Sequence, residues 1–125
     1  MPFEVKCAPD LRAIELRLWQ RLSVSDLQLL LSEVAKLAGE RGYRRALADC
    51  RDYLGGISIG EVFFLAKELS DRPADERGAE AIITPNDPST RADVQCYVDT
   101  AAQFGTNARM FDSREAAVEW LESGQ

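Results

Sequence analysis

Histidine is absent from all 125 residues of this sequence. Without imidazole the chain has no Ser-His-Asp or Cys-His nucleophile pair, no histidine metal ligand and no side chain that ordinarily titrates near neutral pH. Cysteine is scarce as well, because Cys7, Cys50 and Cys96 are widely spaced and form no Cys-x-x-Cys pair. This spacing predicts free thiols rather than a zinc or iron-sulfur site. We therefore expect no metal ion and no cofactor.

Long apolar runs are also missing. No stretch approaches the roughly 18 apolar residues that a membrane span requires. The opening residues, MPFEV, lack the basic segment and apolar core of a secretory signal. Together with the free thiols, these absences predict a cytoplasmic protein that is not an integral membrane protein.

Basic residues are outnumbered, with 15 Lys and Arg against 21 Asp and Glu and a formal charge of -6. Residues 1–60 hold nine basic and eight acidic groups, whereas residues 61–125 hold six and thirteen. This net negative charge repels a phosphate backbone, and the basic residues cluster only weakly in the sequence. Nucleic acid is therefore not an expected partner.

What the sequence does contain is a clear change of hydrophobic period. Residues Phe3–Cys7 and Ile14–Leu18 alternate apolar and polar side chains across an Ala-Pro-Asp turn, which predicts an antiparallel hairpin. From Ser23 the period becomes 3.6, with a stripe of Val24, Leu27, Leu30, Leu31, Val34, Leu37 and Ala38 that ends at Gly42. Ser23-x-x-Asp26 resembles a capping box at the start of this helix.

The remaining segments alternate between strands and helices. The segment Ala46–Cys50 is apolar on both sides apart from Asp49 near its end, which predicts a central strand covered on both faces. We then expect a helix over Ser58–Asp71, a strand over Ala79–Thr84, a helix over Ser89–Phe104, a strand over Ala108–Phe111 and a helix over Ser113–Glu122. The order ββαβαβαβα predicts one α/β domain over residues 1–125, with a five-stranded mixed sheet.

This order resembles the SpoIIAA-like group of STAS domains. The resemblance covers nearly the whole chain and is carried by the hairpin, by the strand ending in Asp49 and by the closing segment RMFDSREAAVEWL at 109–121. It implies a mixed sheet with helices packed on it and a non-enzymatic role, as an interaction switch or as a binder of nucleotide or lipid-like ligands.

Ser58 departs from the pattern of the switch proteins in this family. Their phosphorylated Ser follows at once after an Asp that Asp49 matches, whereas Ser58 lies nine positions after Asp49. Ser58-x-x-Glu61 is instead a capping box for the second helix. We therefore interpret Ser58 as a helix cap rather than as a phosphorylation site.

One face of the second helix, and the loop before it, supply candidate binding residues. Phe64 lies opposite the apolar stripe, and Ile57 projects the same way beside Tyr53 and Leu54. These four residues either form an apolar surface for a protein partner or a second copy of the chain, or leave Phe64 alone outside while the loop residues fold inward. Both interpretations remain open at this point.

Asp49 and Arg51 lie at the carboxyl end of the central strand, where open α/β sheets bind ligands. They can also simply pair with each other. Nothing in the sequence orients an acid, base or nucleophile there, so we expect no enzyme. The leading hypothesis is a STAS-like interaction or ligand-binding module. The alternative is a binder of a small hydrophobic ligand in a pocket between the second and third helices.

Overall fold

The computed structural model describes residues 2–58, 60, 61, 64, 67, 78–105 and 107–123. Its elements are β1 (Phe3–Ala8), the short 3-10 helix η1 (Pro9–Leu11), β2 (Ala13–Gln20), α1 (Val24–Arg41), β3 (Arg45–Tyr53), β4 (Ala79–Ile83), α3 (Pro88–Gln103), β5 (Asn107–Phe111) and α4 (Arg114–Glu122). In the predicted second helix, Gly60, Glu61, Phe64 and Lys67 are helical, and its other residues from 59 to 71 lie outside the described residues.

The five strands form one mixed sheet in the order β1-β2-β3-β4-β5. β1 pairs with β2 antiparallel, and the three later pairs are parallel. The predicted α/β class and mixed sheet are therefore confirmed, with β3 in the centre as its apolar sequence indicated.

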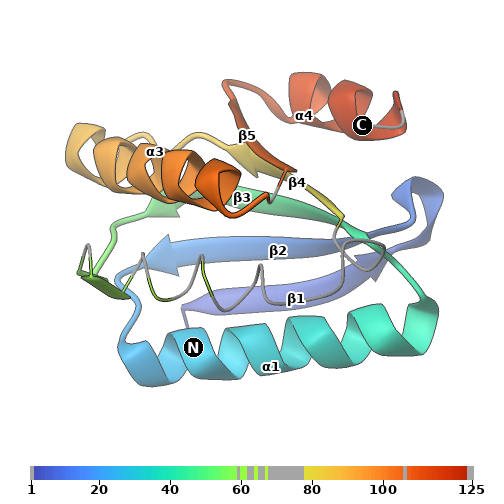
Figure 1. The fold of residues 1–125 in the computed structure, drawn as a ribbon, viewed down its shortest axis with the longest axis horizontal. Coiled ribbons are helices and arrows are strands. Elements are labelled where there is room, and N and C mark those ends of the chain that lie inside the picture. Colours follow the sequence, from blue (N-terminus) through green and yellow to red (C-terminus); the bar gives the residue numbers. More distant parts are fainter. Residues whose placement is uncertain are drawn as a thin grey trace.

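Helices cover both faces of this sheet. On one face, Leu30 of α1 and Val94 of α3 belong to the same buried cluster as Ala48 and Ile82 of the sheet. On the other face, Ala117 and Leu121 of α4 pack against Leu47, Ala81 and Ile83. Figure 1 shows α1 running along β1 and β2, whereas α3 and α4 lie on the side of the sheet formed by β4 and β5. The helices α1 and α3 thus share one face of the sheet, which contains the candidate site.

The helix boundaries follow from local chemistry. Ser23 and Asp26 form the predicted capping box, in which each backbone N–H donates to the other residue's side chain at 3.0 and 3.1 Å. Gly42 ends α1 in the left-handed region at φ 70°, which costs glycine little because it has no Cβ. The predicted apolar stripe is wrong at Val24, which is exposed in the first turn. The helix begins there, before its apolar face meets the sheet.

β3 continues beyond its predicted end at Cys50. The extra residues Arg51 and Asp52 are exposed, but Tyr53 is only 7% exposed and joins the core cluster. The prediction that Tyr53 lies in the loop before the second helix is therefore wrong, because the strand keeps its pairing with β2 as far as Gln20 opposite Tyr53. The alternation of the extended strand turns the ring of Tyr53 inward.

Candidate functional site: a cavity between two helices and the sheet

A cavity of about 180 Å³ lies on the sheet face that α1 and α3 cover. Its lining is almost entirely apolar. The described lining residues are Leu16, Leu18, Leu22, Leu27, Leu30, Leu31, Val34, Ala46, Ala48, Cys50, Tyr53, Ile57, Glu80, Ile82, Asp93, Val94 and Tyr97. The sequence predicted a pocket between the second and third helices, whereas the helical walls described here belong to α1 and α3.

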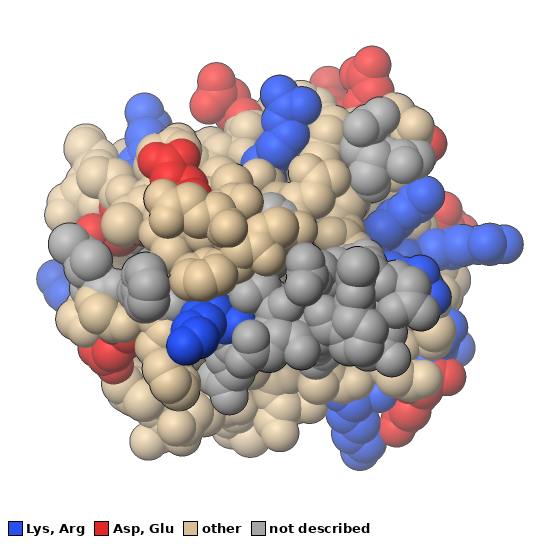
Figure 2. Space-filling view, viewed as in Figure 1, with Lys and Arg blue, Asp and Glu red and all other residues tan. Residues whose placement is uncertain are grey.

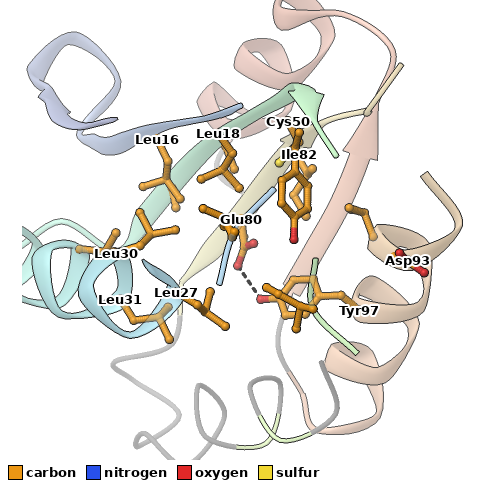
Figure 3. A pocket seen from close by; sticks show the side chains of 17 residues that line it. Leu16, Leu18, Leu27, Leu30, Leu31, Cys50, Glu80, Ile82, Asp93 and Tyr97 are labelled. Atoms are coloured by element: carbon orange, nitrogen blue, oxygen red, sulfur yellow. Dashed lines mark hydrogen bonds between the residues drawn. The ribbon is translucent and has the colours of Figure 1, made fainter. Parts of the chain in front are cut away.

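The walls come from segments that are far apart in the sequence. Figure 3 shows the leucines of α1 and β2 and Tyr97 of α3 pointing toward a common centre, with Glu80 among them. The small side chains of Ala46 and Ala48 form the floor on β3, where longer side chains would fill the space. The cavity thus results from short residues on the central strand beneath two separated helices.

The wall formed by Ile57 depends on the glycines that precede it. Gly56 has φ 103°, and a Cβ there would lie 2.5 Å from the carbonyl oxygen of Leu22. The Leu22 N–H donates to the Gly55 carbonyl at 2.9 Å, and the Leu54 N–H donates to that of Gln20 at 2.8 Å. These bonds fasten the loop after β3 to the loop after β2. Because only glycine fits this approach, the Gly-Gly pair has a structural role.

Glu80 is a carboxylic acid in an otherwise largely apolar lining. It lies on β4, and its carboxyl points into the cavity toward Tyr97 (Figure 3). The Tyr97 hydroxyl donates to Glu80 Oε2 at 2.9 Å. Burial raises the pKa of Glu80, and the Tyr97 hydrogen bond opposes this rise only partly. Burial and the neighbouring carboxyl also raise the pKa of Tyr97 well above its usual range.

The Cys50 thiol and the Tyr53 phenol in the lining stay neutral at physiological pH. Burial, with smaller effects of Glu80 and Asp49, raises the pKa of the Cys50 thiol. Burial likewise raises the pKa of Tyr53 to about 12. A thiol in such surroundings is a poor nucleophile, because the reactive species is the thiolate. Asp93, half-buried on α3, is the second carboxylic acid in the lining.

Asp49 and Arg51 form a pair with each other at the end of β3. The guanidinium donates to both carboxylate oxygens, with Nε–Oδ1 at 3.0 Å and Nη2–Oδ2 at 2.7 Å. This hydrogen bonding lowers the pKa of Asp49. Neither residue lines the cavity. The two predicted ligand-binding side chains therefore satisfy each other's hydrogen bonding. Their role in ligand binding stays a prediction.

The four apolar candidates separate into two groups. Tyr53 is buried and Ile57 packs against the same core cluster, whereas Leu54 is 46% exposed and Phe64 is 66% exposed. The predicted outward direction of Phe64 is thus observed. The alternative in which the loop residues fold inward describes Tyr53 and Ile57 but not Leu54.

Ser58 caps the second helix as its sequence indicates. The Ser58 N–H donates to Glu61 Oε1 at 3.0 Å, and the Glu61 N–H donates to Ser58 Oγ at 3.2 Å. The hydrogen bonds from Ser58 lower the pKa of Glu61. The hydroxyl oxygen is therefore engaged in the cap.

Sequence reasoning did not identify Glu80 as part of a site. It treated 79–84 as an ordinary strand and 89–104, which contains Tyr97, as an ordinary helix. A signal was nevertheless present, because Glu80 is the one charged residue in the strand AEAII. A lone carboxyl in a strand covered by helices must find a partner or a cavity.

Surface charge and metal ligands give no second site among the described residues. Figure 2 shows basic and acidic side chains intermingled around the rim of the visible face, with no continuous basic area. In the described part of the chain, no group of three or more Cys, Asp or Glu residues could hold a metal ion. No described helix has the length and apolar character needed to cross a bilayer.

Comparison with known proteins identifies the fold. The anti-sigma factor antagonist SpoIIAA, in its unphosphorylated form, superposes with a TM-score of 0.59 at 16% sequence identity, covering 98% of this chain and 99% of that one. An uncharacterised protein of the DUF3478 family from Shewanella loihica PV-4, which has a SpoIIAA-like fold, gives a TM-score of 0.62 at 13% identity, covering 95% and 91%. No family model and no curated protein sequence matches the chain. The resemblance noted in the sequence is therefore confirmed as a SpoIIAA-like fold.

Proposed function

We propose that this protein is a non-enzymatic binding module that holds a small apolar ligand in the cavity between α1, α3 and the sheet. The observation that carries this proposal is an apolar space of about 180 Å³ within a single small domain. Native interiors pack closely, with few voids larger than a water molecule. An apolar space of this size therefore favours an occupant.

The size of the cavity indicates the size of the ligand. An engineered apolar cavity of about 150 Å³ in another protein stays dry and binds benzene. A space of about 180 Å³ suits a molecule of similar or slightly larger size. The chemistry of the lining favours binding over catalysis, because its thiol and phenols have raised pKa values and no described lining residue activates them.

A titration with toluene tests this proposal. We expect amide resonances of Leu30, Ala48 and Val94 to shift in two-dimensional NMR spectra as toluene is added, because these residues line the cavity. Leu31→Trp should abolish the shifts by filling the space. Leu29→Trp is the matched control, since Leu29 lies on the same helix but is exposed. Wild-type spectra that show no change, or equal changes in both variants, would contradict the proposal.

A protein contact is the second candidate function, and the exposure of Phe64 and Leu54 favours it. Aromatic side chains at the centre of a desolvated contact can each contribute about 2 kcal/mol. Since SpoIIAA is described as an anti-sigma factor antagonist, a protein partner is also consistent with the shared fold. A second copy of the chain is the simplest partner to test.

The proposed location of the protein is the cytoplasm, where Cys7, Cys50 and Cys96 would stay free thiols.

Sedimentation of purified protein over a range of concentrations tests this surface. Phe64→Ala should weaken self-association while the melting temperature of the monomer stays unchanged, because the ring is largely exposed. A protein that stays monomeric at every concentration would remove the second copy as partner. A loss of several kcal/mol of stability would instead assign Phe64 to the core.

A further inference from the structure

We propose that the ligand carries a primary ammonium group that binds Glu80, and that the cavity discriminates against carboxylates. This inference rests on the proposed function, because it names the polar chemistry of a ligand whose apolar part the cavity encloses. It starts from the position of Glu80, whose carboxyl points into the cavity from β4 while the surrounding walls are apolar (Figure 3).

The hydrogen bonds of Glu80 leave room for such a group. Tyr97 donates to Oε2 at 2.9 Å. Within the described part of the chain, Oε1 accepts no hydrogen bond. A carboxylate among apolar side chains is strongly destabilised unless it is paired and hydrogen-bonded. An ammonium group supplies both the opposite charge and three N–H donors, of which one can meet Oε1.

The charges of the side chains around Glu80 also favour a cationic ligand. The titratable side chains that share its cavity are Asp93, Cys50, Tyr53 and Tyr97. None of them carries a positive charge, and the described lining contains no Lys or Arg. A ligand carboxylate would therefore meet two acidic groups and no basic group, which repels it. A ligand cation would meet complementary charge.

The ligand shape follows from the distribution of polar groups. Leu27, Leu30 and Leu31 of α1 supply an apolar wall, whereas Glu80 and Tyr97 are hydrogen-bonded to each other beside it. A compact ring or short branched chain with one amine arm matches this division. If Glu80 is protonated in the empty protein, binding of the ammonium form releases that proton to solvent, so the charge balances.

Three probes of matched shape test the inference: benzylamine, toluene and benzoate. Each consists of one ring with one substituent, and they differ in carrying a positive charge, no charge and a negative charge. We expect wild-type protein at neutral pH to bind benzylamine about tenfold more tightly than toluene, as a charge-assisted hydrogen bond warrants. Benzoate should bind more weakly than toluene.

Variants of Glu80 identify the group responsible. Glu80→Gln should remove the advantage of benzylamine over toluene while toluene still binds, because the amide keeps the shape and loses the charge. Glu4→Gln, an exposed change on β1, should leave the ranking of the three probes unaltered.

The outcomes separate the two proposals. If toluene binds and benzylamine binds no better, or benzoate binds best, the ammonium inference is overturned while the apolar-ligand proposal stands. If wild-type protein binds none of the three probes, both proposals fail. Because the wild-type ranking alone decides between them, the test does not depend on whether Glu80→Gln folds.

Discussion

Replacing Tyr97 by Phe removes one hydroxyl from the cavity and leaves the ring in place. That hydroxyl donates to Glu80 Oε2 at 2.9 Å. The substitution therefore leaves a carboxyl without its described donor in apolar surroundings. A hydrogen bond between neutral groups contributes about 0.5–1.5 kcal/mol, and one to a charged group about 1.5–3 kcal/mol. The expected loss of stability consequently depends on whether Glu80 is ionised.

The pH dependence has a definite direction. Burial raises the pKa of Glu80 above its ordinary value of 4.5 in the folded protein, so the folded state holds this proton to higher pH than the unfolded state. The contribution of Glu80 to stability is complete below its unfolded pKa and declines as pH rises through its folded pKa. The Tyr97 hydroxyl limits that decline by lowering the pKa of Glu80. Tyr97→Phe should therefore cost about 1 kcal/mol at acidic pH and about 2–3 kcal/mol at alkaline pH.

Urea unfolding from about pH 5 to about pH 9 measures this difference. Tyr97→Phe, Glu80→Gln and the double variant together form a double-mutant cycle. The coupling energy between the two positions should be about 0.5–3 kcal/mol. Tyr43→Phe is the matched control, because no described residue is hydrogen-bonded to the Tyr43 hydroxyl, and it should show no pH-dependent loss. A cost for Tyr97→Phe that is the same at every pH, or a coupling energy of zero, would refute the assignment of Glu80 as an ionisable partner of Tyr97 in the cavity.

Two further predictions concern the frame around the site. Leu121 is 0% exposed in the cluster beneath α4, so Leu121→Ala should lower the free energy of unfolding in urea by about 2–5 kcal/mol. The exposed Leu29→Ala should change it by less than about 0.5 kcal/mol, and equal losses would show that the core is wrongly assigned. Ser58→Ala should cost about 0.5–2 kcal/mol by removing the helix cap, whereas Ser58→Asp should be nearly neutral because Asp also caps helices. Substantial phosphate at Ser58, detected by mass spectrometry of protein from its native cell, would contradict a purely capping role.

Much of the fold could be predicted from the sequence because local periodicity determines it. The alternation in Phe3–Ala8 and Ala13–Gln20 indicates a hairpin, and the caps at Ser23 and Ser58 indicate where helices begin. The segment 46–50, apolar on both sides apart from Asp49, indicates the central strand. Each of these signals lies within a few residues of the structure that it predicts.

Features that depend on distant contacts could not be predicted in the same way. Tyr53 follows two exposed charged residues, and only its pairing beside Gln20 shows that the strand continues. The cavity likewise requires α1, β3 and α3 to be placed together, with Ala46 and Ala48 beneath them. A sequence pattern indicates that such residues are buried, but it does not indicate a space left between them.

The contrast between the two acidic groups bears on function. Asp49 pairs with Arg51 at a partly exposed strand end, where an ion pair contributes roughly 0–1 kcal/mol, and the local pair explains both residues. Glu80 has a single described donor and lies beside unfilled apolar space. An apolar side chain at this position would fill that space and avoid the desolvation of a carboxyl, so considerations of stability alone favour replacing Glu80. Groups that reduce stability in this way are characteristic of binding and catalytic sites, where the structure serves a purpose other than its own stability. The carboxyl in the cavity, rather than the ion pair at the strand end, is therefore the polar group to which a ligand should be matched.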